Sequence, residues 1–260
     1  MLARLLSSTP VSAIAHRGGS GLRPENTLAA FDHAATLGVD AMECDVRLAR
    51  DAVPVVIHDE TLERTTTGAG PVASRTVDEL AQLDAGVHFG ADRGFPFRGR
   101  GFGVPRLVDV LSRHPTMPFV IEIKGEASGA VPAILDAVDR AGARDRVIVG
   151  AFSHAVLDEI RRRAPDVPTS ASGDEIRSAV RRTRVFLRPR SGAYRLLQAP
   201  YRYRGRTVFG RRFVAGARRA GLPVHAWIVD EEADMRTLVS WGVTGLISDR
   251  PDIAVRVRDA

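Results

Sequence analysis

The sequence predicts an α/β barrel of the TIM type, in which eight strands alternate with helices. Apolar runs typical of strands alternate with stretches of helical spacing along most of the chain. A length of 260 residues suits a single barrel. A content of 44% apolar and 26% charged residues is that of an ordinary globular protein. We therefore expect one domain over residues 1–260.

The eight expected strands are short runs rich in β-branched and apolar residues. They are Val11–His16, Ala41–Val46, Phe119–Ile123, Val147–Phe152, Pro168–Ala171, Leu196–Ala199, Pro223–Val229 and Gly245–Ser248. Apolar residues at helical spacing fill most of the intervals between them. Helix ends are marked by Gly38, Gly142, Gly221 and Gly242.

One run, Val53–His58, breaks this alternation because it follows the second strand too closely for a crossover helix. We expect an antiparallel hairpin that turns near Arg50–Asp51. A register that pairs residue 43 with 58 and residue 45 with 56 gives four side chains one common face. These side chains are Glu43, Asp45, Val56 and His58.

Residues 59–105 carry many Gly, Thr, Arg and Pro residues and show little periodicity. Leu80 and Leu83 predict one short helix there. Because long loops inside compact domains usually carry function, we expect this segment to be a lid or a binding insertion within the barrel.

Positive charge is concentrated in one part of the chain. The formal net charge is +6, and residues 176–229 hold 14 Arg and no acidic residue. A solvated Arg-rich surface is one interpretation; an electropositive side that attracts phosphate-bearing ligands or an anionic membrane is the other. Tyrosines lie among these arginines, but no recognised nucleic-acid module is present, so we expect no nucleic-acid partner.

Composition excludes several other classes of protein. A single cysteine cannot form an intramolecular disulfide or a Cys-rich zinc site. No apolar stretch approaches the ~20 residues of a membrane span, and the first ten residues are too polar for a secretory leader. We therefore expect a cytoplasmic protein, and no pattern specifies its oligomeric state.

His16 and Arg17 follow the first expected strand directly, at the barrel end where active sites of this fold lie. A histidine can transfer protons near neutral pH, and an arginine can hold a phosphate through two hydrogen bonds. The alternative is a pair of residues that simply ends a strand. The functional interpretation of this motif therefore depends on whether other candidate site residues lie near it.

Three carboxylates end the next two barrel strands. Glu43 and Asp45 flank Cys44, so alternation points both acids one way and the thiol into the core. Glu122 repeats the pattern on the third barrel strand. Such a group fits a hard divalent cation, Mg²⁺ or Ca²⁺, and salt-bridged surface carboxylates are the alternative if no other site residue converges with them. Lys124, the one lysine among 36 Arg, indicates a position that requires a compact ammonium group.

Four stretches match one family in order and spacing. They are IAHRGGSGLRPENTLAAF (14–31), AMECDVRLARDAVPVVIHDETLERTTTG (41–68), FVIEIKG (119–125) and AWIVDEEADMRTLVSWGVTGLISDRP (226–251). The chain therefore resembles the glycerophosphodiester phosphodiesterase family. At the hairpin turn the family's Thr-Lys-Asp-Gly reads Ala49-Arg50-Asp51-Ala52, a change that affects turn geometry more than chemistry.

The resemblance implies a reaction centre of five residues. His16 and His58 are implied as the acid–base pair, with His58 favoured as the acid and His16 as the base. Glu43, Asp45 and Glu122 are implied as ligands of one divalent cation.

Five further residues are implied in binding and support. Arg17 and Lys124 resemble the family's phosphate contacts, and Trp227 resembles the aromatic wall that covers bound substrate. Glu25 and Asn26 match the family's Pro-Glu-Asn support loop. The segment Ser248–Pro251 is expected to brace the barrel end, and the other five histidines are expected to be structural or exposed.

The activity implied is metal-dependent hydrolysis of glycerophosphodiesters to glycerol 3-phosphate and an alcohol. One alternative is a phospholipase D-like or sphingomyelinase D-like enzyme that acts on lysophospholipids, with residues 176–229 and 59–105 docking a membrane. A binding protein without activity is disfavoured, since binding needs no paired proton carriers such as His16 and His58. A glycosidase is disfavoured because its two carboxylates act across a sugar without a cation.

Overall fold

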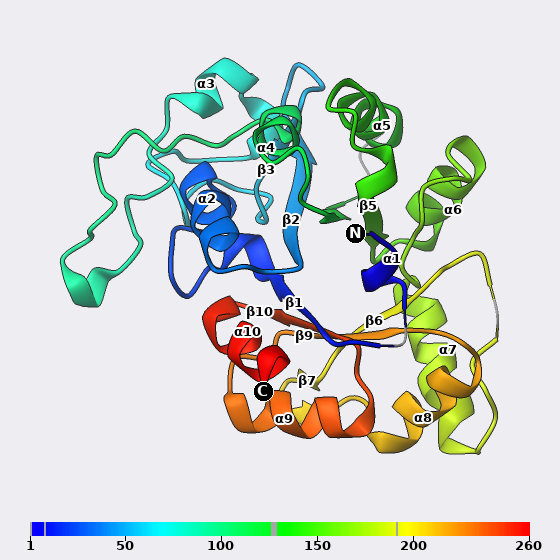
Figure 1. Cartoon of the computed structure of the whole chain (residues 1–260). Helices are drawn as coiled ribbons and strands as arrows, with labels where there is room; N and C mark the ends of the chain where they lie inside the picture. The colour runs from blue at the N-terminus through cyan, green and yellow to red at the C-terminus, as the bar shows by residue number, and fades with distance from the viewer. Residues whose placement is uncertain (1, 8, 126–128, 191) are drawn as a thin grey trace.

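The computed structural model describes residues 2–7, 9–125, 129–190 and 192–260, and its strands form a curled parallel sheet (Figure 1). The strand order is β5-β4-β2-β1-β10-β9-β6. The bounds are β1 Ser12–Ala15, β2 Ala41–Leu48, β4 Phe119–Ile123, β5 Val147–Ala151, β6 Leu197–Pro200, β9 Val224–Trp227 and β10 Gly245–Ser248. Seven of the eight expected strands are thus confirmed to within a few residues.

The remaining expected strand, Pro168–Ala171, is reduced to two isolated β-bridges that close the barrel. Thr169 pairs in parallel with Val149 of β5, and Ser170 pairs in parallel with Leu196 beside β6. The segment ends early because Ser172 caps the next helix, accepting a hydrogen bond from the amide of Glu175. The ring of parallel segments is therefore complete, as the TIM-type prediction requires.

Helices pack around the outside of this ring (Figure 1). The bounds are α2 Leu28–Thr36, α4 Leu107–Arg113, α5 Ala130–Arg140, α6 His154–Arg163, α7 Gly173–Arg184, α8 Arg211–Arg219, α9 Glu232–Trp241 and α10 Pro251–Asp259. Shorter elements are α1 Leu2–Leu5, α3 Val77–Ala81, β3 Pro54–Val56, β7 Arg202–Tyr203, β8 Arg206–Thr207 and the 3₁₀ turns η1 His16–Gly18, η2 Val72–Ser74, η3 Ala91–Arg93 and η4 Arg144–Arg146.

Among the helices that surround the ring, α7 and α10 were not predicted. Helix α7 buries only Ile176, Ala179 and Thr183, too few residues to give a clear apolar stripe in the sequence. Helix α10 starts at Pro251, and a proline at the first helical position is the signal that would have located it.

The predicted hairpin forms between β2 and β3, but its predicted register is wrong by one residue. Val56 pairs with Val46, not with residue 45, and both lie in the core outside the barrel. The turn is a three-residue loop: the amide of Ala49 donates to the carbonyl of Val53, and Ala52 has a φ of +60°. This extra loop residue shifts the pairing. His58 lies in a bend beyond the strand.

Residues 59–105 fold over the hairpin and carry the predicted short helix, α3. Leu62, Val72, Leu80 and Val104 form a small apolar cluster with residues of the hairpin, including Val55. Within the described part of the chain, no helix is long and apolar enough to cross a membrane.

The interior of the barrel is filled by apolar side chains, and α1 covers it at the end where the strands begin. Leu5 packs there with Ile14, Val120 and Ile247. The Nε2–H group of His225 in β9 donates to the carbonyl of Leu5 at 2.9 Å, and the ring is fully buried. Burial lowers the pKa of His225 to about 4.

The free energy of unfolding should therefore decrease as the pH is lowered, and part of this decrease should depend on His225. The unfolded ring binds a proton below its ordinary pKa of 6.5, whereas the folded ring stays neutral down to about pH 4. The contribution of the neutral His225 ring to the free energy of unfolding is complete above pH 6.5. About 2 kcal/mol of it is lost as the pH falls from about 7 to 5. Urea denaturation of wild type and His225→Gln should show a steeper loss for the wild type. Parallel losses over this range would contradict the assignment.

Candidate active site

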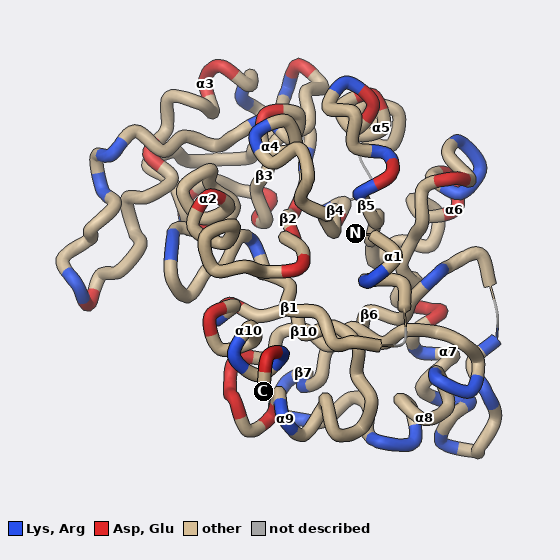
Figure 2. Tube along the Cα trace, viewed as in Figure 1, with Lys and Arg blue, Asp and Glu red and all other residues tan. Residues whose placement is uncertain are grey.

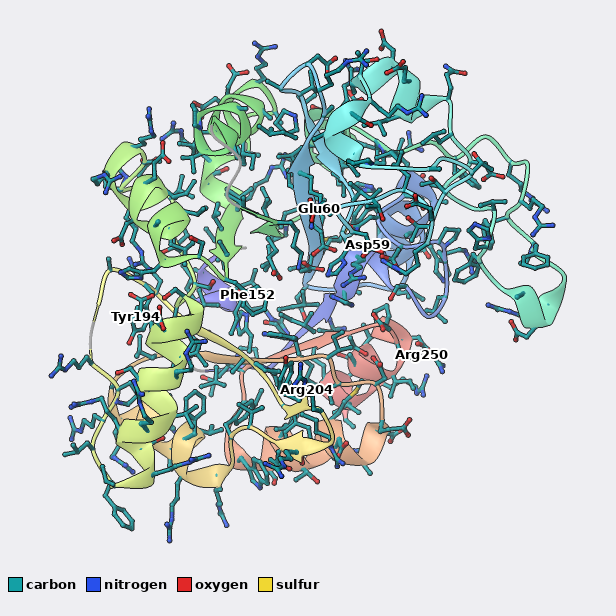
Figure 3. All side chains as sticks on the ribbon, turned by 180° about the vertical axis from the view of Figure 1, so that it is seen from behind. Asp59, Glu60, Phe152, Tyr194, Arg204 and Arg250 are labelled. Carbon is teal, nitrogen blue, oxygen red and sulfur yellow. The ribbon has the colours of Figure 1, made fainter. Side chains whose placement is uncertain are left out.

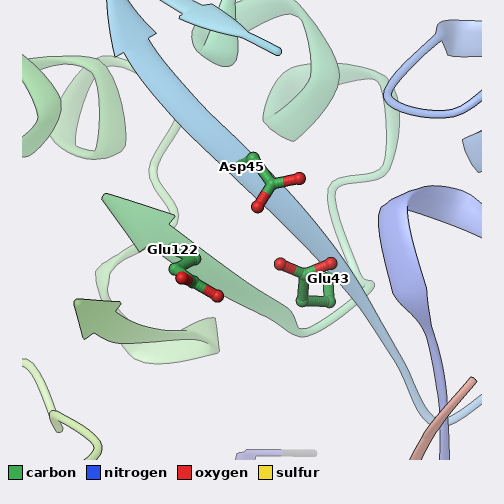
Figure 4. A group of neighbouring side chains, drawn as sticks. All are labelled: Glu43, Asp45 and Glu122. Carbon is green, nitrogen blue, oxygen red and sulfur yellow. The ribbon is translucent and has the colours of Figure 1, made fainter. Parts of the chain in front are cut away.

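Three carboxylates converge at the C-terminal end of the barrel strands (Figure 4). Glu43 and Asp45 project inward from β2, and Glu122 projects from β4, where it pairs directly with Asp45. One oxygen from each lies within 4.8 Å of the others. Cys44, between the two acids of β2, is buried in the core outside the barrel. The alternation predicted from the sequence is thus observed.

The cluster fits a divalent cation. The Oε1 atom of Glu43 is buried and has no hydrogen-bond partner among the described residues. Burial, followed by the charges of Asp45 and Glu122, raises the pKa of Glu43 to about 8. A buried carboxylate oxygen without a donor is costly, even though the other oxygen of Glu43 accepts from a backbone amide. Three oxygen donors on adjacent rigid strands are the set that Mg²⁺ or Ca²⁺ prefers, and no thiolate or imidazole that would favour Zn²⁺ belongs to the cluster.

Two side-chain cations balance part of this negative charge. The Nζ atom of Lys124 lies 3.0 Å from Asp45 and 2.7 Å from Glu122, and the Nε atom of Arg17 lies 2.9 Å from Asp45. Burial opposes ionisation of Asp45, but Lys124 and then Arg17 lower its pKa. Both residues with implied phosphate contacts therefore lie at the edge of the acidic cluster.

The loop after β1 brings Arg17 to this position. Arg17 has a φ of +51°, and its backbone amide donates to Glu43 at 2.9 Å. Gly18 also has a positive φ, and a Cβ atom at that position would lie 2.7 Å from the Cβ of Ala30. The tight turn therefore requires glycine there, and it directs both the amide and the guanidinium of Arg17 toward the carboxylates.

The predicted support residues contact this loop and the acids. The side-chain amide of Asn26 donates to Asp45 at 2.9 Å, and Glu25 accepts from Arg17 at 2.8 Å. Glu25 is also held by both terminal nitrogens of Arg64, at 2.8 Å each. Glu25 and Asn26 thus fix the positions of groups that the cation and a phosphate would contact.

Each candidate histidine has its Nδ1 atom on a carboxylate. His16 lies 2.5 Å from Asp249, and His58 lies 2.6 Å from Asp59. This arrangement leaves both Nε2 atoms for proton transfer. Burial disfavours the charged form of His16, but Glu43 and then Asp249 raise its pKa; burial lowers the pKa of His58.

Asp249 was missed as a site residue. The segment Ser248–Pro251 was expected only to brace the barrel end, yet Asp249 accepts hydrogen bonds from His16 and from the hydroxyl of Ser20. Asp230 holds this turn, accepting from the Ser248 hydroxyl and the Asp249 amide at 2.8 Å each. An acid placed directly after the last strand was the signal that could have identified it.

Asp59 and Arg64 were also missed. Arg64 donates to Asp59 as well as to Glu25, and it lowers the pKa of Asp59 more than any other group. The adjacent sequence His58-Asp59 was the available signal. The two residues connect the bend that carries His58 to the support loop.

A cavity of about 490 Å³ opens beside Glu122. Most of its walls are apolar, and they include Phe152, Ile176, Val208 and Trp227. The rings of Phe152 and Trp227 meet edge to face at 6.0 Å. Figure 3 shows Phe152 and Asp59 on opposite sides of the barrel centre. The predicted aromatic wall, Trp227, therefore lines a space large enough for the organic part of a small diester.

Residues 16–253 match the model of the Glycerophosphoryl diester phosphodiesterase family. The chain belongs to this family. A glycerophosphodiester phosphodiesterase of Caldanaerobacter subterraneus is 32% identical over 94% of this chain and 96% of its own length. The resemblance found in the sequence is thus confirmed, and the enzyme class is that of a phosphoric diester hydrolase.

Solved structures of other family members share the fold. A glycerophosphodiester phosphodiesterase from Agrobacterium tumefaciens is 29% identical, covers 95% of this chain and all of its own, and superposes with a TM-score of 0.75. An Oleispira antarctica phosphodiesterase, solved in complex with the product sn-glycerol-3-phosphate, is 25% identical and superposes with a TM-score of 0.78. It covers 95% of this chain and 96% of its own length.

Replacement of Asp249 tests whether it positions His16. Asp249→Asn should lower kcat by roughly tenfold to a hundredfold with little change in KM, because the ring loses its fixed tautomer. Nitrogen NMR of the His16 ring should show that change directly. Asp252→Asn, in the neighbouring pair with Arg250, is the matched control and should retain activity. Equal activity in both variants with an unchanged His16 spectrum would exclude this role.

Proposed function

We propose that this phosphodiesterase hydrolyses glycerophosphodiesters to glycerol 3-phosphate and an alcohol, with one divalent cation and two histidines. The observation that carries the proposal is the meeting of three carboxylates and two carboxylate-held imidazoles at one barrel end. The product complex of the Oleispira antarctica relative supports the choice of substrate class.

The phosphate would bind where positive charge borders the acids. Glu43, Asp45 and Glu122 would hold the cation, which polarises a phosphoryl oxygen and offsets its charge. Arg17 and Lys124 would neutralise the charge that develops on the other phosphoryl oxygens. Both lie at hydrogen-bonding distance from Asp45, so they already face this position.

The two histidines would transfer the protons. Following the family pattern, His16 takes the proton of the attacking oxygen, which belongs to water or to the neighbouring glycerol hydroxyl. His58 gives a proton to the leaving alkoxide. Asp249 and Asp59 hold the rings with Nδ1 occupied, which leaves each Nε2 atom to react.

The rest of the molecule would shape the substrate. Trp227 and Phe152 would pack against the organic part of the diester in the adjoining cavity. We further propose that residues 1–260 form one catalytic domain. Within it, the insertion at residues 59–105 supports His58 through Asp59 and Arg64.

Substitution of each histidine tests the proton transfers. His16→Ala and His58→Ala should each lower turnover of glycerophosphocholine by two or more orders of magnitude, roughly the contribution of general acid–base catalysis. A diester with a p-nitrophenyl leaving group needs no acid, so His58→Ala should recover activity on it and His16→Ala should not. His225→Gln, at the end of the barrel that α1 covers, serves as a folding control. Recovery in His16→Ala alone would reverse the two roles.

Removal of metal ions tests the carboxylate site. Protein treated with a chelator should lose activity and regain it with Mg²⁺ or Ca²⁺. The same ions should raise the melting temperature of the wild type but not that of Glu43→Gln. Full activity in excess chelator, with no ion-dependent stabilisation, would refute the site.

A further inference from the structure

Three consecutive large apolar side chains are exposed where helix α7 ends. Val185, Phe186 and Leu187 leave 63%, 72% and 50% of their surface open to solvent. We refer to these three residues as the apolar tip. Adjacent exposed apolar groups of this kind indicate a surface that contacts another molecule.

The backbone of the apolar tip would suit glycine better than phenylalanine. The amide of Phe186 donates to the carbonyl of Thr183 at 3.2 Å, and the amide of Leu187 donates to that of Arg182 at 2.9 Å. Phe186 has a φ of +63°. This is the Schellman arrangement, whose left-handed residue is usually glycine. Phenylalanine there is strained and gains no core burial, so the fold does not account for it.

Uncompensated positive charge surrounds the apolar tip. Figure 2 shows Lys and Arg concentrated over α7 and α8, the two helices beside it. The guanidinium of Arg212 stacks over the Phe186 ring, 4.9 Å from its centroid. Of the 14 arginines in residues 176–229, only Arg177 and Arg202 pair with a carboxylate among the described residues.

We propose that the apolar tip and its flanking arginines dock the enzyme onto an anionic lipid bilayer. Apolar side chains would enter the region below the headgroups while guanidinium groups remain at the lipid phosphates. A nucleic acid fits less well, because Val185 and Leu187 cannot stack on bases. The combination of uncompensated arginines with exposed aliphatic side chains therefore favours lipid.

The apolar tip lies beside a groove that adjoins the active-site cavity. A second cavity of about 400 Å³ separates α7 from residues 207–213 and is lined by Arg184 and Arg212. Val208 lines both this cavity and the one beside Glu122. Docking would thus place a bilayer beside the groove that adjoins the cavity next to Glu122. Docking of this kind does not depend on the catalytic mechanism.

Vesicle co-sedimentation tests the docking. The full chain should sediment with vesicles of phosphatidylcholine mixed with phosphatidylglycerol, and not with phosphatidylcholine alone. Added salt should weaken the binding, because surface charges are screened. Equal binding to both kinds of vesicle, or none to the anionic kind, would overturn the proposal.

Phe186→Gly separates docking from folding. Glycine relieves the left-handed backbone, so the melting temperature should be unchanged or higher. Binding to the anionic vesicles should fall roughly tenfold or more with the loss of the buried ring. Full vesicle binding in this variant would overturn the proposal. So would a lower melting temperature with dissociation of a dimer in sedimentation velocity, since the ring would then hold a second copy of this chain.

The arginines are tested by a charge-matched pair of double variants. Arg184→Ser with Arg212→Ser should weaken vesicle binding roughly tenfold or more, because each arginine at the surface contributes to attraction. Arg75→Ser with Arg100→Ser removes the same charge from the insertion and should keep wild-type binding. Equal loss in both double variants would show attraction by net charge alone, and a loss confined to the insertion variant would place docking there. Either outcome would overturn the proposal.

Discussion

The burial of three carboxylates at one end of a parallel barrel is the constraint on which the rest of the site depends. Like charges so close in a low-dielectric setting repel one another and lose hydration. Strand geometry makes the crowding unavoidable, because Asp45 and Glu122 are paired residues of adjacent strands. The chain must therefore supply positive charge nearby, and Lys124 and Arg17 supply it on one side. Glu43 keeps one oxygen without a partner among the described residues, which is the side where a cation fits.

The residues around this cluster form two hydrogen-bonded series that end at the histidines. In one, Glu25 binds Arg64, Arg64 binds Asp59, and Asp59 binds His58. In the other, Asp230 fixes the turn that presents Asp249 to His16. Orientation of both rings is thus set before any substrate arrives. Such preorganised polar groups cost nothing further at the moment of reaction, which is the main electrostatic advantage of an enzyme site.

The sequence located the strands and the three acids because both leave local signals. Apolar runs mark strands that are buried on both faces, and alternation alone places Glu43 and Asp45 on one side of β2. The hairpin register could not be obtained this way. It depends on how many residues the turn uses, and Ala52 adopts the left-handed conformation without the glycine that would have indicated it. Asp249 was missed because its partner, His16, lies at the other end of the chain.

At the proposed phosphate site, the one lysine and the arginine near it differ in how firmly they are held. Arg17 is held by its own backbone amide on Glu43 and by its guanidinium on Asp45 and Glu25, so it cannot leave without breaking several bonds. Lys124 holds Asp45 and Glu122 through one ammonium group on a flexible stem. A cation held by Asp45 and Glu122 would compete with that ammonium group for their oxygens, and the flexible stem would let the ammonium group reach a phosphate oxygen. A planar guanidinium in its place would have to give up a two-pronged interaction to do the same. This difference gives a physical reason for a lysine at position 124 in a chain that otherwise uses arginine.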